Sequence, residues 1–176
     1  MSKLFLSVFL FLFLSGCSGQ DHQLETGTQV DTEVLSERDQ DIIRYVIETL
    51  YSPPKGKVFF LTVTPMKDWG ATCQWADLPP DLRQSISHLP IKYRPASEAT
   101  MTKAGLVVDS STNEPGWMRW VTVDRWVSDT EVYVESGDYV QGGFGSSIGR
   151  YIKVDGKWQE QSREPSTADF LTPIEL

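Results

Sequence analysis

The fold is decided by residues 117–161, which read WMRWVTVDRWVSDTEVYVESGDYVQGGFGSSIGRYIKVDGKWQEQ. β-Branched and aromatic residues dominate this stretch, and short turn-forming segments interrupt them, which is typical of consecutive strands. The pattern predicts strands over 117–127, 130–136, 139–144, 148–154 and 157–161. Asp155-Gly156 predicts a two-residue hairpin between the last two, because these residues tolerate positive φ angles. The glycine-rich segment 142–149 is expected to bulge or bend the sheet.

One amphipathic helix is predicted upstream, over about residues 36–51. Its apolar residues recur at helical spacing: Leu35, Ile42, Ile43, Val46, Ile47 and Leu50. Ser36 and Asp39 have the spacing of a capping box at its start, and Pro53-Pro54 ends it. A buried strand is predicted over 57–64, and an irregular stretch with a short helix near 80–86 follows it. Further strands are expected near 91–94 and 104–109.

These elements predict an α+β domain in which one N-terminal amphipathic helix packs on a curved antiparallel meander sheet. The sequence shows no regular alternation of strands with long helices, which a parallel sheet would require. The element order resembles cystatin-like and NTF2-like folds in outline. No motif supports either family, so the resemblance implies an architecture and no function.

The N-terminus predicts how the protein is delivered. Residues 1–17 read MSKLFLSVFLFLFLSGC, with an apolar run from Leu4 to Leu14. As a helix this run would rise roughly 16 Å, about half of a ~30 Å hydrocarbon core, so it fits a signal peptide better than a membrane span. The motif Leu14-Ser15-Gly16-Cys17 resembles the lipobox of bacterial lipoproteins.

The lipobox resemblance implies cleavage before Cys17 and its acylation, which would anchor the protein to the lipid bilayer of a bacterial envelope. Ser18 is not the Asp that would resemble an inner-membrane retention signal, so the outer membrane is expected if the cell is Gram-negative. An ordinary signal peptide, with Cys17 as a free thiol, is the alternative. The expected segments are a signal peptide (1–16), the lipidated Cys17 with a flexible tether (17–35), one domain (36–163) and a tail (164–176).

Composition excludes several classes of function. The 16 basic and 24 acidic residues give a net charge of −8, which argues against nucleic-acid binding because phosphates require clustered basic residues. Two Cys and two His leave little for a metal cluster, and no cofactor is expected. With Cys17 acylated, Cys73 is the remaining thiol, and we expect it to be buried and inert.

One surface is a candidate site. If Ser128-Asp129 forms a turn, Val123 faces Val134 on an aliphatic side of the sheet that lies under the helix. The opposite side then gathers aromatic and acidic residues. These are Trp120, Asp124, Trp126, Glu131, Tyr133 and Glu135.

Three interpretations of this face remain open. It is a half-solvated sheet surface, a platform that binds a glycan or an envelope protein, or a carbohydrate hydrolase site with two carboxylates. Asp124 and Glu131 would be diagonal neighbours ~7–8 Å apart, within the ~6.5–9.5 Å range of an inverting glycosidase. The sequence favours a non-enzymatic binding or envelope-interaction module, with the hydrolase as the alternative.

Overall fold

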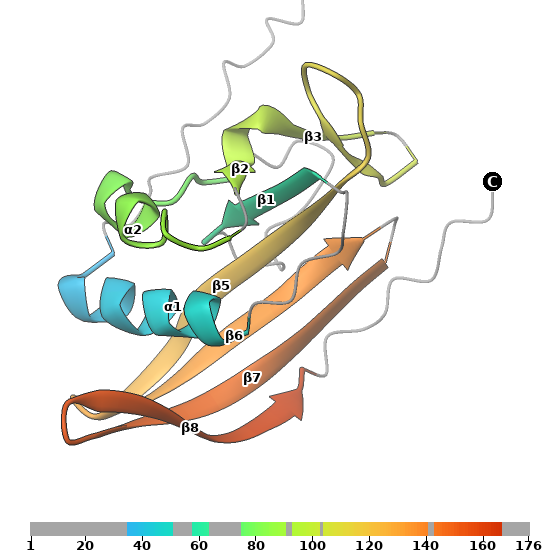
Figure 1. Cartoon of the computed structure of the whole chain (residues 1–176). Coiled ribbons are helices and arrows are strands. Elements are labelled where there is room, and N and C mark those ends of the chain that lie inside the picture. Colours follow the sequence, from blue (N-terminus) through green and yellow to red (C-terminus); the bar gives the residue numbers. More distant parts are fainter. Residues whose placement is uncertain are drawn as a thin grey trace, which may run out of the picture.

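The computed structural model describes residues 35–50, 58–63, 75–90, 93–102, 104–140 and 143–166. Within them the chain is a mixed α/β protein with a six-stranded sheet and few helices (Figure 1). The signal peptide, Cys17, most of the tether, Cys73 and the end of the tail lie outside the described residues.

The large sheet has the strand order β2-β1-β5-β6-β7-β8. Its strands are β1 (Val58–Thr62), β2 (Arg94–Pro95), β5 (Gly116–Ser128), β6 (Glu131–Val140), β7 (Gly143–Val154) and β8 (Lys157–Pro165). Strands β5 to β8 form an antiparallel meander, but β1 pairs in parallel with both β2 and β5. The expectation of a wholly antiparallel sheet is therefore wrong at this edge. The connection between β1 and β5 is long enough to allow this parallel pairing, since parallel neighbours require a crossover of a dozen or more residues.

Helix α1 (Glu37–Thr49) covers one face of this sheet (Figure 1). The Ser36 hydroxyl accepts a hydrogen bond from the Asp39 N–H at 3.3 Å, and the Asp39 carboxylate accepts one from the Ser36 N–H at 3.1 Å. At the other end, Arg119 from β5 donates to the Leu50 carbonyl, which no further helical turn can satisfy. The buried stripe of α1 packs with α2 (Pro80–Ser85) and the sheet in one core.

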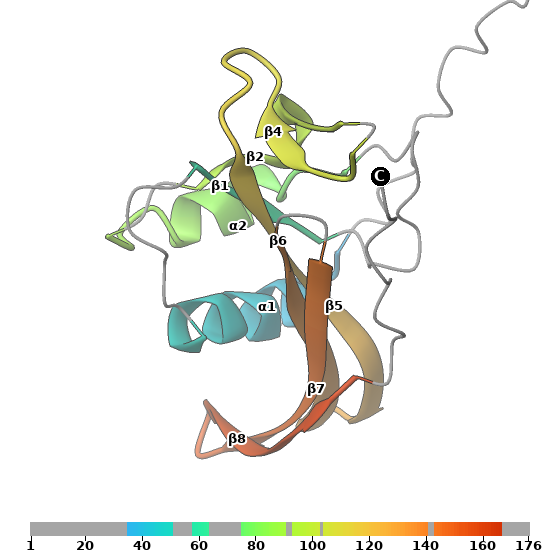
Figure 2. The ribbon, with the colours of Figure 1, turned by 90° about the vertical axis from the view of Figure 1, so that its right-hand side faces the viewer.

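A second core lies on the opposite face, at one end of the sheet. Trp120 belongs to it whereas Val121 belongs to the core under α1, as the alternation of side chains along a strand requires. The β3 (Ala99–Met101) and β4 (Val107–Asp109) pair and the short η2 helix (Ala96–Glu98) contribute to this second core. Figure 2 shows the sheet from the side, with α1 on one side of it.

Two predicted strand breaks are absent. Strands β6 and β7 pair without a register shift from Val140–Gly143 to Glu131–Ile152, so the described part of the glycine-rich segment, 143–149, contains no bulge against β6. A Cβ added at Gly137 would lie 2.3 Å from a ring carbon of Trp120. Gly137 therefore makes room for a buried ring, and does not mark a turn. The predicted Asp155-Gly156 hairpin is confirmed, with φ angles of 50° and 75°.

Candidate functional site

The register between β5 and β6 departs from the prediction beyond Val123. The predicted pair Val123–Val134 is present, but bulges interrupt the ladder between Val123 and Arg125 and again between Trp126 and Ser128. The observed pairs beyond Val123 are Arg125–Tyr133, Trp126–Val132 and Ser128–Glu131. The turn is therefore Asp129-Thr130, and the predicted turn Ser128-Asp129 is wrong.

The first bulge moves Trp126 to the face that carries α1, because one extra residue in a strand reverses the side of every residue after it. There the Trp126 indole Nε1–H donates to Asp39 Oδ1 at 2.8 Å. The Arg38 guanidinium lies 4.5 Å from its ring centroid, and the Trp158 ring lies 5.9 Å away. Trp126 thus joins the helix to the sheet and is absent from the predicted aromatic face.

Trp120 is also unable to offer a ring to a ligand, because it is fully buried in the second core. Of the predicted aromatic residues, Tyr133 alone remains on the uncovered side, where the Arg125 guanidinium lies 4.1 Å from its ring centroid. Glu131 and Glu135 alternate with Tyr133 along the same strand and share its side. The structure therefore does not bring the six predicted residues together on one surface.

The predicted pair of carboxylates is not formed either. Glu131 lies opposite Ser128, and Asp124 falls in the first bulge and has no partner in the ladder, so the two are not the diagonal neighbours that the prediction required. Each of these two carboxylates is paired with an arginine: Arg150 donates to Glu131 at 2.8 Å, and Arg125 donates to Asp124 at 2.9 Å.

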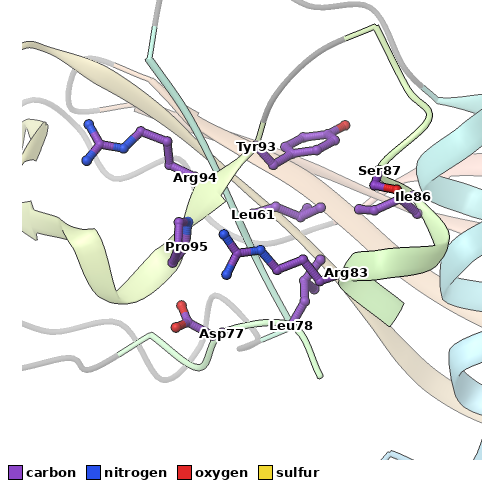
Figure 3. Close-up of a pocket in the computed structure, with 9 residues that line it drawn as sticks. All are labelled: Leu61, Asp77, Leu78, Arg83, Ile86, Ser87, Tyr93, Arg94 and Pro95. Atoms are coloured by element: carbon purple, nitrogen blue, oxygen red, sulfur yellow. The ribbon is translucent and has the colours of Figure 1, made fainter. Parts of the chain in front are cut away.

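A pocket of about 310 Å³ lies instead between α2, β1 and β2 (Figure 3). This volume is at the lower end of the ~300–1,000 Å³ range of small-molecule sites. Its apolar lining comes from four residues on different elements: Leu61, Leu78, Ile86 and Pro95. Its polar lining comes from Asp77, Arg83, Ser87, Tyr93 and Arg94. The pocket thus combines an apolar interior with a few polar groups, as binding sites for small molecules do.

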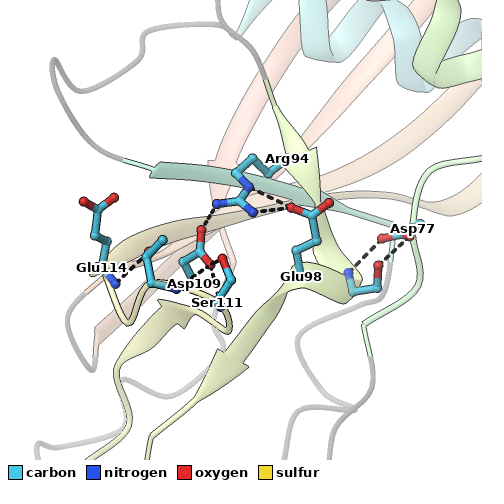
Figure 4. A network of polar contacts seen from close by, with 8 residues as sticks. Asp77, Arg94, Glu98, Asp109, Ser111 and Glu114 are labelled. Atoms are coloured by element: carbon cyan, nitrogen blue, oxygen red, sulfur yellow. Dashed lines mark hydrogen bonds and ion pairs between the residues drawn. The ribbon is translucent and has the colours of Figure 1, made fainter.

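Arg94 lines this pocket, but its guanidinium is directed elsewhere (Figure 4). Its Nε and Nη2 atoms donate to Glu98 Oε2 at 2.7 and 2.5 Å, and its Nη1 atom forms an ion pair with Asp109. Asp109 is fully buried and also accepts hydrogen bonds from the backbone and hydroxyl of Ser111. A buried carboxylate is stable only when it is paired in this way, so Arg94 ties β2 to β4.

The other two charged residues of the pocket, Asp77 and Arg83, differ in whether their side chains have a hydrogen-bond partner. Asp77 accepts hydrogen bonds from the Ser97 N–H and hydroxyl at 2.8 and 2.7 Å, one on each carboxylate oxygen (Figure 4). Arg83 is exposed, and its guanidinium forms no hydrogen bond or ion pair with any residue in the described part of the chain. Figure 3 shows its side chain reaching from α2 toward Pro95 and Asp77.

A second hollow, of about 360 Å³, lies between α1 and α2 and has an acidic rim. Asp41 lines this hollow and accepts hydrogen bonds from Lys153 at 2.9 Å and from Trp158 at 3.0 Å. Burial raises the pKa of Asp41, but these two hydrogen bonds and the charge of Arg44 outweigh burial, so the pKa lies below its ordinary value. These contacts join α1 to the β7–β8 hairpin.

Sequence reasoning missed the pocket because its lining residues carry no motif. Arg83 is one of several polar residues in a short helix, and Leu61 and Pro95 belong to separate strands. The parallel pairing of strands β1 and β2 brings Leu61 and Pro95 together, and no local sequence pattern indicates that pairing.

The described residues contain no group of three or more His, Cys, Asp or Glu side chains placed to bind a metal ion. Among the helices in the described ranges, none is both long enough and apolar enough to cross a membrane. No model of a known protein family matches the chain, and comparison with curated proteins and with solved structures finds no match either.

Proposed function

We propose that this chain is a lipid-anchored protein of the bacterial envelope whose folded domain is a non-enzymatic binding module for a small, largely apolar ligand. The lipobox-like residues Leu14-Ser15-Gly16-Cys17 support the anchor, and Ser18 favours the outer membrane if the cell is Gram-negative. In outline, the helix on a curved sheet is similar to cystatin-like and NTF2-like folds, and this likeness carries no part of the functional argument.

The observation that carries the binding proposal is the pocket between α2, β1 and β2. Leu61, Leu78 and Ile86 present buried or nearly buried apolar side chains to a space of about 310 Å³. An engineered apolar cavity of about 150 Å³ binds benzene. A space roughly twice that size would hold a compound with two fused rings.

A neutral two-ring compound, 2-naphthalenemethanol, tests this proposal. The full chain is held in nanodiscs of a neutral lipid, and its binding of the compound is measured by equilibrium dialysis against empty nanodiscs. Ser87→Trp should weaken binding at least about fivefold, because Ser87 lines the pocket and an indole there would occupy its space. Ser162→Trp on β8 is the matched control, because Ser162 is also exposed and lies outside the pocket lining.

Thermal unfolding of each variant shows whether it is folded. Wild-type binding that is retained by Ser162→Trp and weakened in Ser87→Trp would support the proposal. Absence of saturable binding to the wild-type protein above the empty-nanodisc level would contradict it, as would equal binding by the two variants.

A further inference from the structure

The charges around the pocket point to a more specific ligand. We infer that the pocket binds an amphipathic carboxylate, with its apolar part inside and its carboxylate on the Arg83 guanidinium at the mouth. This inference rests on the proposed function, because it names the class of ligand that the same pocket takes.

The charged residues among the described pocket lining differ in whether another residue already engages them. Arg94 is engaged by Glu98 and Asp109, and Asp77 has one hydrogen bond from Ser97 on each oxygen. Arg83 is left as the lining charge that has no partner in the described part of the chain. A negatively charged ligand would give the Arg83 guanidinium the partner that it lacks, whereas the carboxylate of Asp77 is already hydrogen-bonded by Ser97.

The pocket lining combines exposed polar residues with buried apolar ones. Arg83 and Ser87 are exposed, whereas Leu78 and Ile86 are buried. An anion held by the exposed Arg83 guanidinium keeps part of its hydration, which avoids the large cost of burying a charge. The apolar part of the same ligand gains the free energy of leaving water.

Among anions, a carboxylate matches the Arg83 side chain best. A guanidinium presents its N–H donors in a planar fork that matches the two oxygens of a carboxylate. The described lining supplies a single free cation, which balances a single negative charge and not the double charge of a phosphate monoester. The net charge of −8 disfavours anions at long range, so the preference must arise locally at Arg83.

Three probes that share one ring system test the inference: 2-naphthoate, 2-naphthalenemethanol and 2-naphthylmethylammonium. Equilibrium dialysis uses the full chain in neutral-lipid nanodiscs at pH 7 and low ionic strength. We expect 2-naphthoate to bind about fivefold more tightly than the alcohol, and the ammonium compound to bind more weakly than the alcohol. A fivefold difference corresponds to about 1 kcal/mol, the upper end for an exposed ion pair.

Arg83→Gln should remove the preference for 2-naphthoate while the alcohol still binds as before. Arg125→Gln is the matched control, because it removes another exposed positive charge, from the opposite face of the sheet. It should leave the preference intact.

The outcomes separate the inference from the proposed function. If the alcohol binds and 2-naphthoate binds no more tightly, the inference is wrong and the proposed function stands. The inference is equally overturned if Arg83→Gln keeps the preference, or if Arg125→Gln removes it to the same degree. If none of the three probes binds, the proposed function itself fails.

Discussion

Replacing Gly137 with alanine tests whether the missing side chain at this position makes room for the buried Trp120 ring. A Cβ at this position would lie 2.3 and 2.5 Å from two carbons of the Trp120 ring and 2.4 Å from the Gly145 carbonyl oxygen. Both obstacles are rigid. Trp120 is fully buried among other core residues, and the carbonyl belongs to the backbone of the neighbouring strand β7.

The expected magnitude follows from two opposing contributions. Overpacking a close-packed core typically costs about 1–3 kcal/mol. Alanine in a strand interior recovers roughly 0.5–1 kcal/mol relative to glycine, because glycine loses more conformational freedom on folding. Since the clash involves both a ring and a backbone atom, we expect the cost at its upper end and a net destabilisation of about 2 kcal/mol.

Gly145→Ala is the matched control. Gly145 lies in the same hairpin, opposite Asp138, and nothing lies within 4 Å of a Cβ added there. This variant should be as stable as the wild-type protein or more stable by up to about 1 kcal/mol. Urea unfolding followed by tryptophan fluorescence gives both free energies. A Gly137→Ala protein within 0.5 kcal/mol of Gly145→Ala would refute the packing explanation.

Three further predictions follow from other parts of the chain. Cys17→Ala should abolish incorporation of labelled palmitate and leave unprocessed precursor, whereas mass spectrometry that finds an unmodified Cys17 in the mature protein would exclude the lipid anchor. Because its folded-state pKa is lowered, Asp41 stabilises the fold above its unfolded value of about 3.9, and this contribution is lost as the pH falls through the folded-state pKa. The difference in unfolding free energy between wild type and Asp41→Asn, measured from pH 7 to pH 2, should therefore shrink in the acid range; a constant difference would contradict this assignment. Val134→Ala should lower the free energy of unfolding by roughly 1–3 kcal/mol in urea, because Val134 is buried under α1, and an unchanged midpoint would contradict its place in that core.

The sequence by itself determined the elements that depend on a few neighbouring residues. Ser36 and Asp39 satisfy each other's backbone groups within one turn, so the start of α1 follows from two residues three apart. Asp155-Gly156 adopts positive φ angles that other residues disfavour, so the last hairpin is also a local property. The pair Val123–Val134 followed from alternation in two adjacent strands.

Only the tertiary structure decided which surfaces these elements form. The bulge after Val123 turns Trp126 toward α1, where its indole reaches Asp39, and the strand pattern contains no sign of that distant partner. The close approach of Trp120 made Gly137 a packing position, although its sequence context resembles a turn. Arg83 and Pro95 meet at one pocket because β2 pairs with β1 across a long stretch of chain. Local patterns report the backbone preferences of neighbouring residues, whereas contacts between distant segments arise only when the whole chain packs.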